Sequence, residues 1–168
     1  MSRWKLLAIL LCSTAAMGCS SAPPNIGGVK ADQIVILKSK HLMILMANGK
    51  PLRSYRVALG KSDGSKERQG DHKTPEGQYV IDQKNAQSHF HLALHVSYPN
   101  TADRKRAHDA GVYPGGAIMI HGVEEQFSWL GPLQHEVDWT DGCIAVTNRE
   151  MDDVWQLVTV GTPVEIKP

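Results

Sequence analysis

The sequence lacks an excess of charge of either sign and has few aromatic residues. Its 168 residues carry a net charge of +1, with 18 Lys and Arg against 17 Asp and Glu, and Phe, Trp and Tyr make up 6%. Proteins that bind nucleic acid usually present a basic surface and aromatic side chains on which bases stack. We therefore expect no nucleic-acid partner. The length and the 42% hydrophobic content suit one globular domain.

A run of about 20 apolar residues, which a membrane-spanning helix needs, is also lacking. The apolar stretch that starts at residues 6–11 follows a basic segment and closes at Ala16-Met17-Gly18-Cys19. Small residues before a cysteine are typical of a bacterial lipobox. Residues 1–19 are therefore predicted to be a lipoprotein signal peptide, with Cys19 as the lipidated residue. Ser20 indicates a periplasmic protein anchored to the outer membrane; the alternative is ordinary cleavage that leaves a soluble periplasmic protein.

Cysteine is scarce, and this scarcity is informative. Of three cysteines, Cys12 lies in the predicted leader and Cys19 would carry lipid, so Cys143 remains alone. No disulfide can then form within the mature domain. A free thiol is a liability in an oxidising compartment. We expect that Cys143 is kept because it is used.

Cys143 follows Gly142 and precedes a short apolar run, which places its thiol where a loop enters a strand. Upstream, the apolar residues 117–120 end in His121 and Gly122. A thiol and a histidine at strand ends are the composition of a nucleophile and its base, and a nearby imidazole is expected to lower the thiol pKa. They are 22 residues apart, so the fold must bring them together. The alternative is that Cys143 is a small buried apolar residue.

These residues resemble a known family. His121-Gly122 followed by Thr140-Asp141-Gly142-Cys143-Ile144 is similar to the signature of the L,D-transpeptidases, the YkuD-type catalytic domain. Lys73-Thr74-Pro75-Glu76-Gly77-Gln78-Tyr79, Ser97-Tyr98-Pro99-Asn100 and Pro114-Gly115-Gly116 extend the resemblance. Two positions depart from the pattern: the usual His before Gly-Cys is Asp141, and the usual polar residue two places after the Cys is Ala145. Both are expected at the rim of the site.

The resemblance implies a cysteine acyltransferase that acts on peptidoglycan, with no metal and no organic cofactor. Cys143 would attack the stem peptide before its terminal D-Ala, with His121 as base and the Gly122 carbonyl as one possible partner of the imidazole. The backbone N–H groups of Gly142 and Cys143 would hold the oxyanion. The predicted substrate cleft is made by Thr140, Asp141, Tyr113 and Trp139.

The fate of the thioester stays open at this point. An amine acceptor gives a cross-link or attaches a protein to the wall. Water gives an L,D-carboxypeptidase, or a hydrolase that releases a wall-linked lipoprotein. A non-catalytic peptidoglycan-binding lipoprotein on the same scaffold is a further alternative.

The pattern of apolar residues predicts an α+β domain, mainly β, at residues 32–168, after a flexible tether at 20–31. Its fold is expected to be an L,D-transpeptidase-like β-sandwich with one or two packed helices. Strands are predicted at 33–37, 41–46, 52–58, 78–82 and 164–166, with a hairpin turn at Asn48-Gly49. Helices are predicted after Asn100 or Thr101 and after the capping box Thr147-Asn148-Arg149-Glu150.

Three further segments carry polar side chains. Residues 59–74 are expected to form a surface loop with His72 in solvent. His89, His91 and His95 would share one face of a strand, where they line the cleft, face solvent or bind zinc; a zinc peptidase would use His91, His95 and His121. Residues 124–139 are predicted to form a lid whose aromatic side chains shield a thioester from water.

Overall fold

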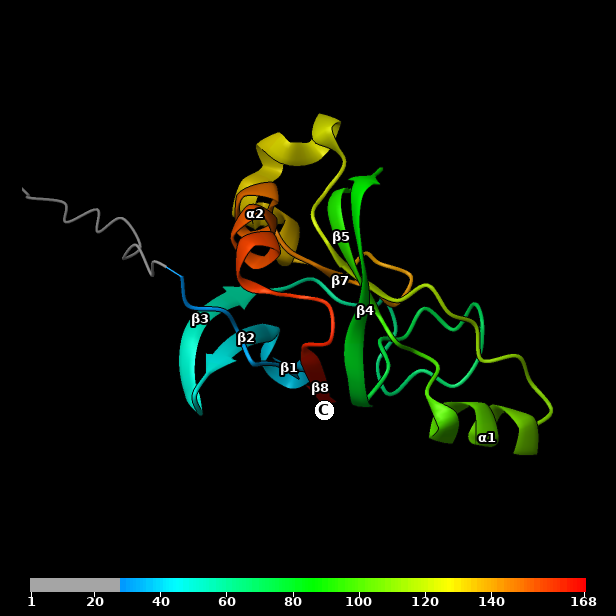
Figure 1. Ribbon diagram of the computed structural model, residues 1–168. Helices are drawn as coiled ribbons and strands as arrows, with labels where there is room; N and C mark the ends of the chain where they lie inside the picture. The colour runs from blue at the N-terminus through cyan, green and yellow to red at the C-terminus, as the bar shows by residue number, and fades with distance from the viewer. Residues whose placement is uncertain (1–27) are drawn as a thin grey trace, which may run out of the picture.

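The computed structural model describes residues 28–168 (Figure 1). The predicted leader at 1–19, with Cys19, and residues 20–27 of the predicted tether lie outside the described residues. The strands are β1 (Gln33–Leu37), β2 (Leu42–Ala47), β3 (Lys50–Arg56), β4 (Gly77–Ser88), β5 (His91–Val96), β6 (Met119–His121), β7 (Ile144–Ala145) and β8 (Pro163–Lys167). The helical segments are the α-helices α1 (Thr101–Asp109) and α2 (Asn148–Leu157) and the 3₁₀ segments η1 (Lys38–Lys40) and η2 (Glu125–His135).

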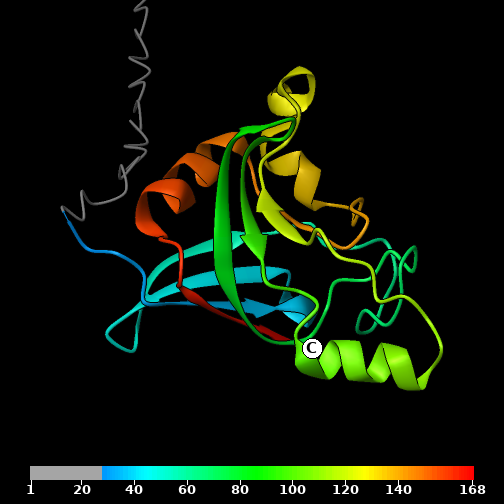
Figure 2. The same ribbon diagram turned by 45° about the vertical axis from the view of Figure 1, so that its right-hand side comes forward.

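All eight strands of the described chain belong to one sheet, in the order β3-β2-β1-β8-β4-β5-β6-β7. The long strand β4 pairs with β8 through its first residues and with β5 through its later ones, so it belongs to both halves of the sheet. The half with β1, β2 and β3 runs across the half with β4 and β5, and α2 lies over both (Figures 1 and 2). The α+β, mainly β fold is confirmed, and its two layers are halves of one curled sheet.

The first three strands form a meander that the apolar pattern predicts well. β1 has the predicted bounds and pairs with β2 in antiparallel register. Asn48 and Gly49 both have positive φ, 52° and 72°, as expected of a two-residue turn whose twist matches that of the strands. Ile34, Ile36 and Met43 are fully buried, because alternate residues face the core.

Helix α2 closes the core, and its first turn can be explained from the sequence. The Thr147 side chain accepts a hydrogen bond from the Glu150 amide, and the Glu150 carboxylate accepts one from the Thr147 amide, which confirms the predicted capping box. Met151 and Val154 are fully buried against the sheet. In the described part of the chain no helix has the length and apolar character needed to cross a membrane.

Helix α1 likewise begins with a capping box, made by Asn100 and Asp103. The sequence predicts a helix start after Asn100 or Thr101, and the cap is Asn100. The predicted lid contains η2, which is interrupted where Gly131 leaves helical geometry and Pro132 follows. Proline has no N–H to continue the hydrogen-bond pattern. Residues 124–139 therefore form two short turns joined by a kink (yellow in Figure 1).

The chain after β3 returns to the far edge of the sheet. Ala58 forms an antiparallel bridge with Ala145, and Gly60 forms a parallel bridge with Thr140. These two bridges join residues that follow β3, at one end of the strand order, to residues in and before β7, at the other end. They also hold the loop that carries Cys143 against residues 58–60.

Candidate active site

The candidate site lies on the face of β5, β6 and β7 that points away from the core cluster. Leu94, Ile120 and Ile144 belong to that cluster and are fully buried. Because successive side chains of a strand point to opposite faces, the odd-numbered residues of these strands point the other way. The residues on this opposite face are Ala93, His95, Met119, His121, Cys143 and Ala145.

His121 and Cys143 come together through the register of β6 and β7. These strands are parallel, and His121 is paired with Ala145, two residues after Cys143. Neighbouring strands lie about 4.8 Å apart and two residues advance about 6.6 Å. The two Cα atoms are therefore on the order of 8 Å apart, with both residues on one face of the sheet. The register thus places the predicted base and the predicted nucleophile on neighbouring segments of the same face.

The imidazole of His121 is held in one orientation and shielded from water. Its Nδ1 lies 2.6 Å from the Gly122 carbonyl oxygen, so Nδ1 donates a hydrogen there and Nε2 keeps the lone pair. The ring packs at 4.7 Å from Phe90 and at 5.9 Å from Trp139, measured between ring centroids. Burial lowers the pKa of His121, and the Gly122 carbonyl offsets this only in part. The imidazole is therefore neutral at pH 7 and suited to accept a proton through Nε2.

The Cys143 thiol is partly buried, and its pKa differs from the sequence-based expectation. Burial raises the pKa of the thiol, and the Asp141 carboxylate adds to this, whereas the Met119 amide and the Lys66 ammonium lower it. The thiol donates a hydrogen bond to the Ala117 carbonyl oxygen over 3.6 Å. The expected lowering of the thiol pKa by a nearby imidazole is not found, since burial is the largest effect and raises the pKa. The resting pair is a thiol and a neutral imidazole.

The turn before Cys143 is fixed by Thr140 and Gly142. The Thr140 hydroxyl donates to the Cys143 carbonyl at 2.8 Å and accepts from the Gly142 amide at 3.1 Å. Gly142 has a φ of 119°, and a Cβ built on it would lie 2.5 Å from the Lys73 carbonyl oxygen, so only glycine fits. Thr140, predicted to line the cleft, is instead 3% exposed and stabilises the turn. Because the Gly142 amide is engaged, Cys143 is the remaining predicted amide for an oxyanion.

Position 122 needs a glycine because its backbone lies close to the first residue of α2. A Cβ at Gly122 would lie 2.4 Å from Oδ1 of Asn148. That oxygen accepts a hydrogen bond from the Val123 amide at 2.7 Å. The first residue of α2 therefore fixes the segment whose carbonyl orients His121.

Asp141 and Ala145, the two departures from the family pattern, lie in different surroundings. The Asp141 side chain is 72% exposed at the rim, as expected, and its Oδ1 accepts from Lys61 Nζ at 2.9 Å and from His72 Nδ1 at 2.8 Å. The hydrogen bonds from Lys61 and His72 lower the pKa of Asp141. Ala145 was expected at the rim but is fully buried, because Ala58 and His121 lie on either side of it.

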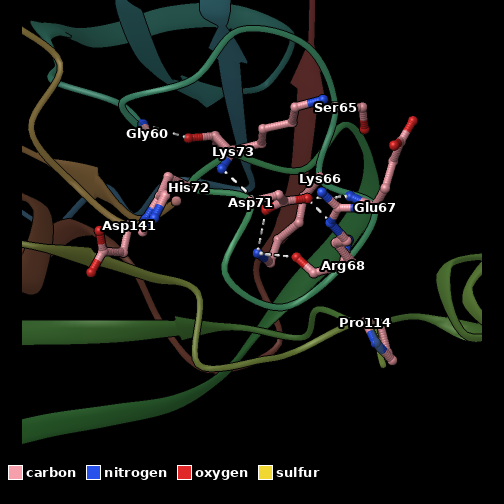
Figure 3. A network of polar contacts seen from close by, with 12 residues as sticks. Gly60, Ser65, Lys66, Glu67, Arg68, Asp71, His72, Lys73, Pro114 and Asp141 are labelled. Carbon is pink, nitrogen blue, oxygen red and sulfur yellow. Dashed lines mark hydrogen bonds and ion pairs between the residues drawn. The ribbon is translucent and has the colours of Figure 1, made fainter. Parts of the chain in front are cut away.

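A buried ion pair stabilises the loop that carries His72 (Figure 3). Lys66 and Asp71 lie 2.8 Å apart, with 4% and 7% of their side chains exposed. Asp71 also accepts hydrogen bonds from the amides of Glu67, Arg68 and Lys73. The predicted surface loop is thus ordered by internal charge pairing, and its Lys66 is close enough to Cys143 to lower the thiol pKa.

The other predicted site residues are divided between two places. Trp139 packs against His121. Phe90, Phe127, Leu133 and Trp139 line an apolar groove of about 470 Å³ beside the imidazole, between the predicted lid and the sheet. Tyr113 is 69% exposed and lines a separate hollow with α1 residues such as Ala107 and His108.

The three histidines of the proposed metal cluster bind separate carboxylates. His91 lies 2.7 Å from Asp152 and His95 lies 2.5 Å from Asp82. His89 lies in the turn after β4, outside the strand, and contacts Glu124 at 3.3 Å. Within residues 28–168, no group of three or more His, Cys, Asp and Glu side chains is placed to hold a metal ion.

Three elements of the site were not predicted from the sequence. Phe90 covers the imidazole from the turn between β4 and β5, and no local pattern marks it. Asn148 lies within the predicted capping box at residues 147–150. The box predicts its place at the start of α2 but not its contact with Val123. The pairing of His72 with Asp141 joins residues 69 positions apart. Only the fold reveals it.

Comparison with known proteins identifies the same family as the sequence motifs. A family model described as the L,D-transpeptidase catalytic domain, YkuD, matches residues 31–166. The Escherichia coli (strain K12) protein named "Putative L,D-transpeptidase YafK" is 36% identical over 111 residues, which are 64% of this chain and 37% of YafK. The chain thus spans little more than a third of the length of this curated relative.

Solved structures show the same fold. The helical cell shape determining protein Pgp2 from Campylobacter jejuni superposes with a TM-score of 0.63 at 24% identity, over 83% of this chain and 48% of Pgp2. The L,D-transpeptidase from Xylanimonas cellulosilytica gives a TM-score of 0.58 at 15% identity, over 88% of this chain and 64% of that one. At these identities the likeness concerns the fold.

Proposed function

The chain belongs to the L,D-transpeptidase catalytic domain family, whose members modify peptidoglycan, and we propose that it performs acyl transfer on peptidoglycan stem peptides with Cys143 as nucleophile. The donor is a stem tetrapeptide, cut between the L-centre of diaminopimelate and the terminal D-Ala. The acceptor of the acyl group is an amine. The orientation of His121 by Gly122, next to the thiol in strand register, is the observation that carries this proposal.

In the first half-reaction, the Cys143 sulfur attacks the carbonyl carbon of the scissile amide. His121 Nε2 takes the thiol proton as the C–S bond forms, because both groups start neutral. The oxyanion accepts a hydrogen bond from the Cys143 amide. When the C–N bond breaks, the imidazolium returns the proton to the nitrogen of the leaving D-Ala. The product is a thioester, and His121 is neutral again.

In the second half-reaction, the acceptor attacks the thioester carbonyl and the C–S bond breaks. An amine acceptor yields an amide; water yields a carboxylate. The apolar groove beside Trp139 and Phe90 limits water on the His121 side of the thioester. This supports an amine acceptor, with hydrolysis as the alternative outcome of the same intermediate.

The direct test is incubation of the full chain with purified tetrapeptide muropeptides, followed by mass spectrometry. Release of D-Ala with formation of cross-linked muropeptides is expected for the wild type and not for Cys143→Ala. Tripeptides without cross-links would show a carboxypeptidase. Release of wall-linked protein from intact sacculi would show a hydrolase of that linkage. If wild type and variant leave all of these substrates unchanged, the chain is a binding protein and the proposal is wrong.

The cellular location proposed here depends on Cys19. Lipidation of this residue would anchor the domain to the outer membrane, facing peptidoglycan in the periplasm. Metabolic labelling with an alkyne fatty acid tests this directly. Label is expected on the wild-type chain and not on Cys19→Ser, and equal labelling of both would contradict the anchor.

A further inference from the structure

We propose that His72, oriented by Asp141, is the base that accepts the proton of the incoming acceptor in the second half-reaction. This inference rests on the proposed function, because it concerns the fate of the thioester on Cys143. It assigns the two half-reactions to two different imidazoles: His121 serves the thiol and His72 serves the acceptor.

His72 and Asp141 form a histidine–carboxylate pair at the rim of the site. Nδ1 of His72 lies 2.8 Å from Oδ1 of Asp141, so Nδ1 donates to the carboxylate and Nε2 keeps its lone pair. Lys61 binds the same oxygen at 2.9 Å and holds the carboxylate in place. Figure 3 shows the His72 and Asp141 side chains next to one another. A carboxylate that orients an imidazole in this way stabilises the imidazolium formed on proton uptake.

The pair is held against the turn that carries the thiol. The Lys73 carbonyl, one residue after His72, would lie 2.5 Å from a Cβ at Gly142. A Cβ at Gly60 would lie 2.3 Å from the His72 carbonyl and 3.1 Å from the Gly142 Cα. These contacts place the backbone of residues 72–73 directly on the residue before Cys143. Asp141 is itself two residues before the thiol.

Access to the thioester favours the His72 side. His121 is 4% exposed and covered by Phe90 and Trp139, so its imidazole is closed to solvent on that side. His72 and Asp141 have 46% and 72% of their side chains exposed. Of the two imidazoles, that of His72 is therefore the one open to an acceptor from solvent. The backbone of His72 also has a φ of 55°, a conformation that non-glycine residues seldom adopt and that the Asp71 hydrogen bonds hold in place.

The acceptor nitrogen or oxygen bonds to the thioester carbon while its proton passes to His72 Nε2. The tetrahedral intermediate collapses, the C–S bond breaks, and the Cys143 sulfur leaves as thiolate. The imidazolium of His72 then gives its proton to solvent, and the thiolate takes one from solvent. Thiol and both imidazoles are restored, and no oxidant or further reactant is consumed.

The test separates the two half-reactions with His72→Gln. The full chain is mixed with tetrapeptide muropeptide; D-Ala release measures acylation and intact-protein mass measures decay of the acyl-enzyme. We expect unchanged acylation, accumulation of acyl-enzyme and discharge slowed by about 10²-fold, the contribution typical of a general base. Hydroxylamine, which attacks thioesters without a base, should discharge wild type and variant equally. Asp141→Asn should slow discharge by less.

His108→Gln is the matched control, because His108 is an exposed imidazole next to Asp109 on α1. It should match the wild type in both half-reactions. Equal discharge rates for His72→Gln and wild type would overturn the inference and leave the proposed function intact. A fall in acylation and discharge together would also overturn it, because His72 would then only stabilise the loop. Absence of any acyl-enzyme on the wild type would overturn the proposed function itself.

Discussion

His121 and Ala145 face each other across the parallel strands β6 and β7, and the Val146 amide donates to the His121 carbonyl at 2.9 Å. Ala145 is fully buried, so the space beside the imidazole is filled by a single methyl group. The position of the proposed base therefore depends on the small size of residue 145. A larger side chain there would have to displace His121 or the bridge to Ala58.

Ala145→Val is expected to lower D-Ala release at least tenfold. Added methyl groups in a packed site cost about 1–3 kcal/mol and move neighbouring groups. Ala86→Val, at an exposed position of β4, is the control and should leave both activity and urea unfolding unchanged. Full activity of Ala145→Val would show that the register does not position His121.

The Cys143 thiol should react slowly with iodoacetamide at pH 7 and faster in alkali. Burial raises its pKa, so the thiolate forms above the value of about 8.5 of a free thiol. The alkylation rate of the peptide that contains Cys143 can be followed by mass spectrometry from pH 5 to pH 10. A rate already at its plateau near pH 6 would indicate a preformed thiolate–imidazolium pair and contradict the neutral resting state.

Trp139→Ala should move the acid limb of the pH–rate profile upward. Burial lowers the pKa of His121, and the imidazole must be neutral to act as base, so wild-type kcat/KM should fall only below the ordinary value of about 6.5. Removing Trp139 admits water and brings the pKa back toward that value. Trp129, which is 76% exposed, offers the control Trp129→Ala, whose profile should match the wild type. If the acid limbs of the two variants lie at the same pH, Trp139 does not shield the His121 imidazole from water.

Gly122→Ala should inactivate the protein, because its Cβ would meet Asn148 Oδ1 at 2.4 Å. Gly116→Ala is the control, since a Cβ there meets no atom within 4 Å. Asn148→Ala should cost about 1–3 kcal/mol of unfolding free energy, because the Val123 amide loses its acceptor. Asn148→Asp keeps that acceptor and should remain closer to wild type in a urea titration.

Asp71→Asn should destabilise the fold by about 3–5 kcal/mol at pH 7, because it leaves the Lys66 ammonium buried without a counter-charge. Burial alone would raise the pKa of Asp71, but hydrogen bonds from the Arg68 amide and from Lys66 outweigh it and lower the pKa. The ion pair with Lys66 thus stabilises the fold at a pH above about 3.9, the usual pKa of an Asp side chain. This stabilisation is lost as the pH falls toward the lower pKa that Asp71 has in the folded protein. Urea unfolding at pH 7 and pH 3 measures the loss of stability and its dependence on pH. The control is Asp63→Asn, at an exposed position of the same loop, which should leave the unfolding free energy unchanged at both pH values. Equal unfolding of the two variants at pH 7 would show that the ion pair contributes nothing.

Local patterns in the sequence predict the parts of the fold that local physics determines. The apolar alternation of β1, the Asn48-Gly49 turn and the capping box of Thr147 and Glu150 are all found as predicted. β4 extends six residues beyond the predicted end at 82, because its second half is largely solvent-exposed and polar and carries no apolar alternation.

The sequence predicts the residue types of the candidate site but not their geometry. Cys143 and His121 stand out by residue type. Their alignment depends on β7, a strand of two residues whose register comes from long-range pairing with Ile120 and His121. The raised pKa of Cys143 follows from burial, which no sequence motif reports. The exposed position of Tyr113, away from the imidazole, is likewise a property of the loop path after α1.

Strand β8 lies in the middle of the sheet, parallel to β1 and antiparallel to β4, although it follows every other strand in the sequence. A nascent chain that has not yet reached residues 163–167 can pair β1 with β2 and β4 with β5, but β1 and β4 then have no strand between them. The bridges of Ala58 to Ala145 and of Gly60 to Thr140 are the links left between the two halves. The continuous sheet that supports the candidate site would therefore form late, when β8 enters between β1 and β4.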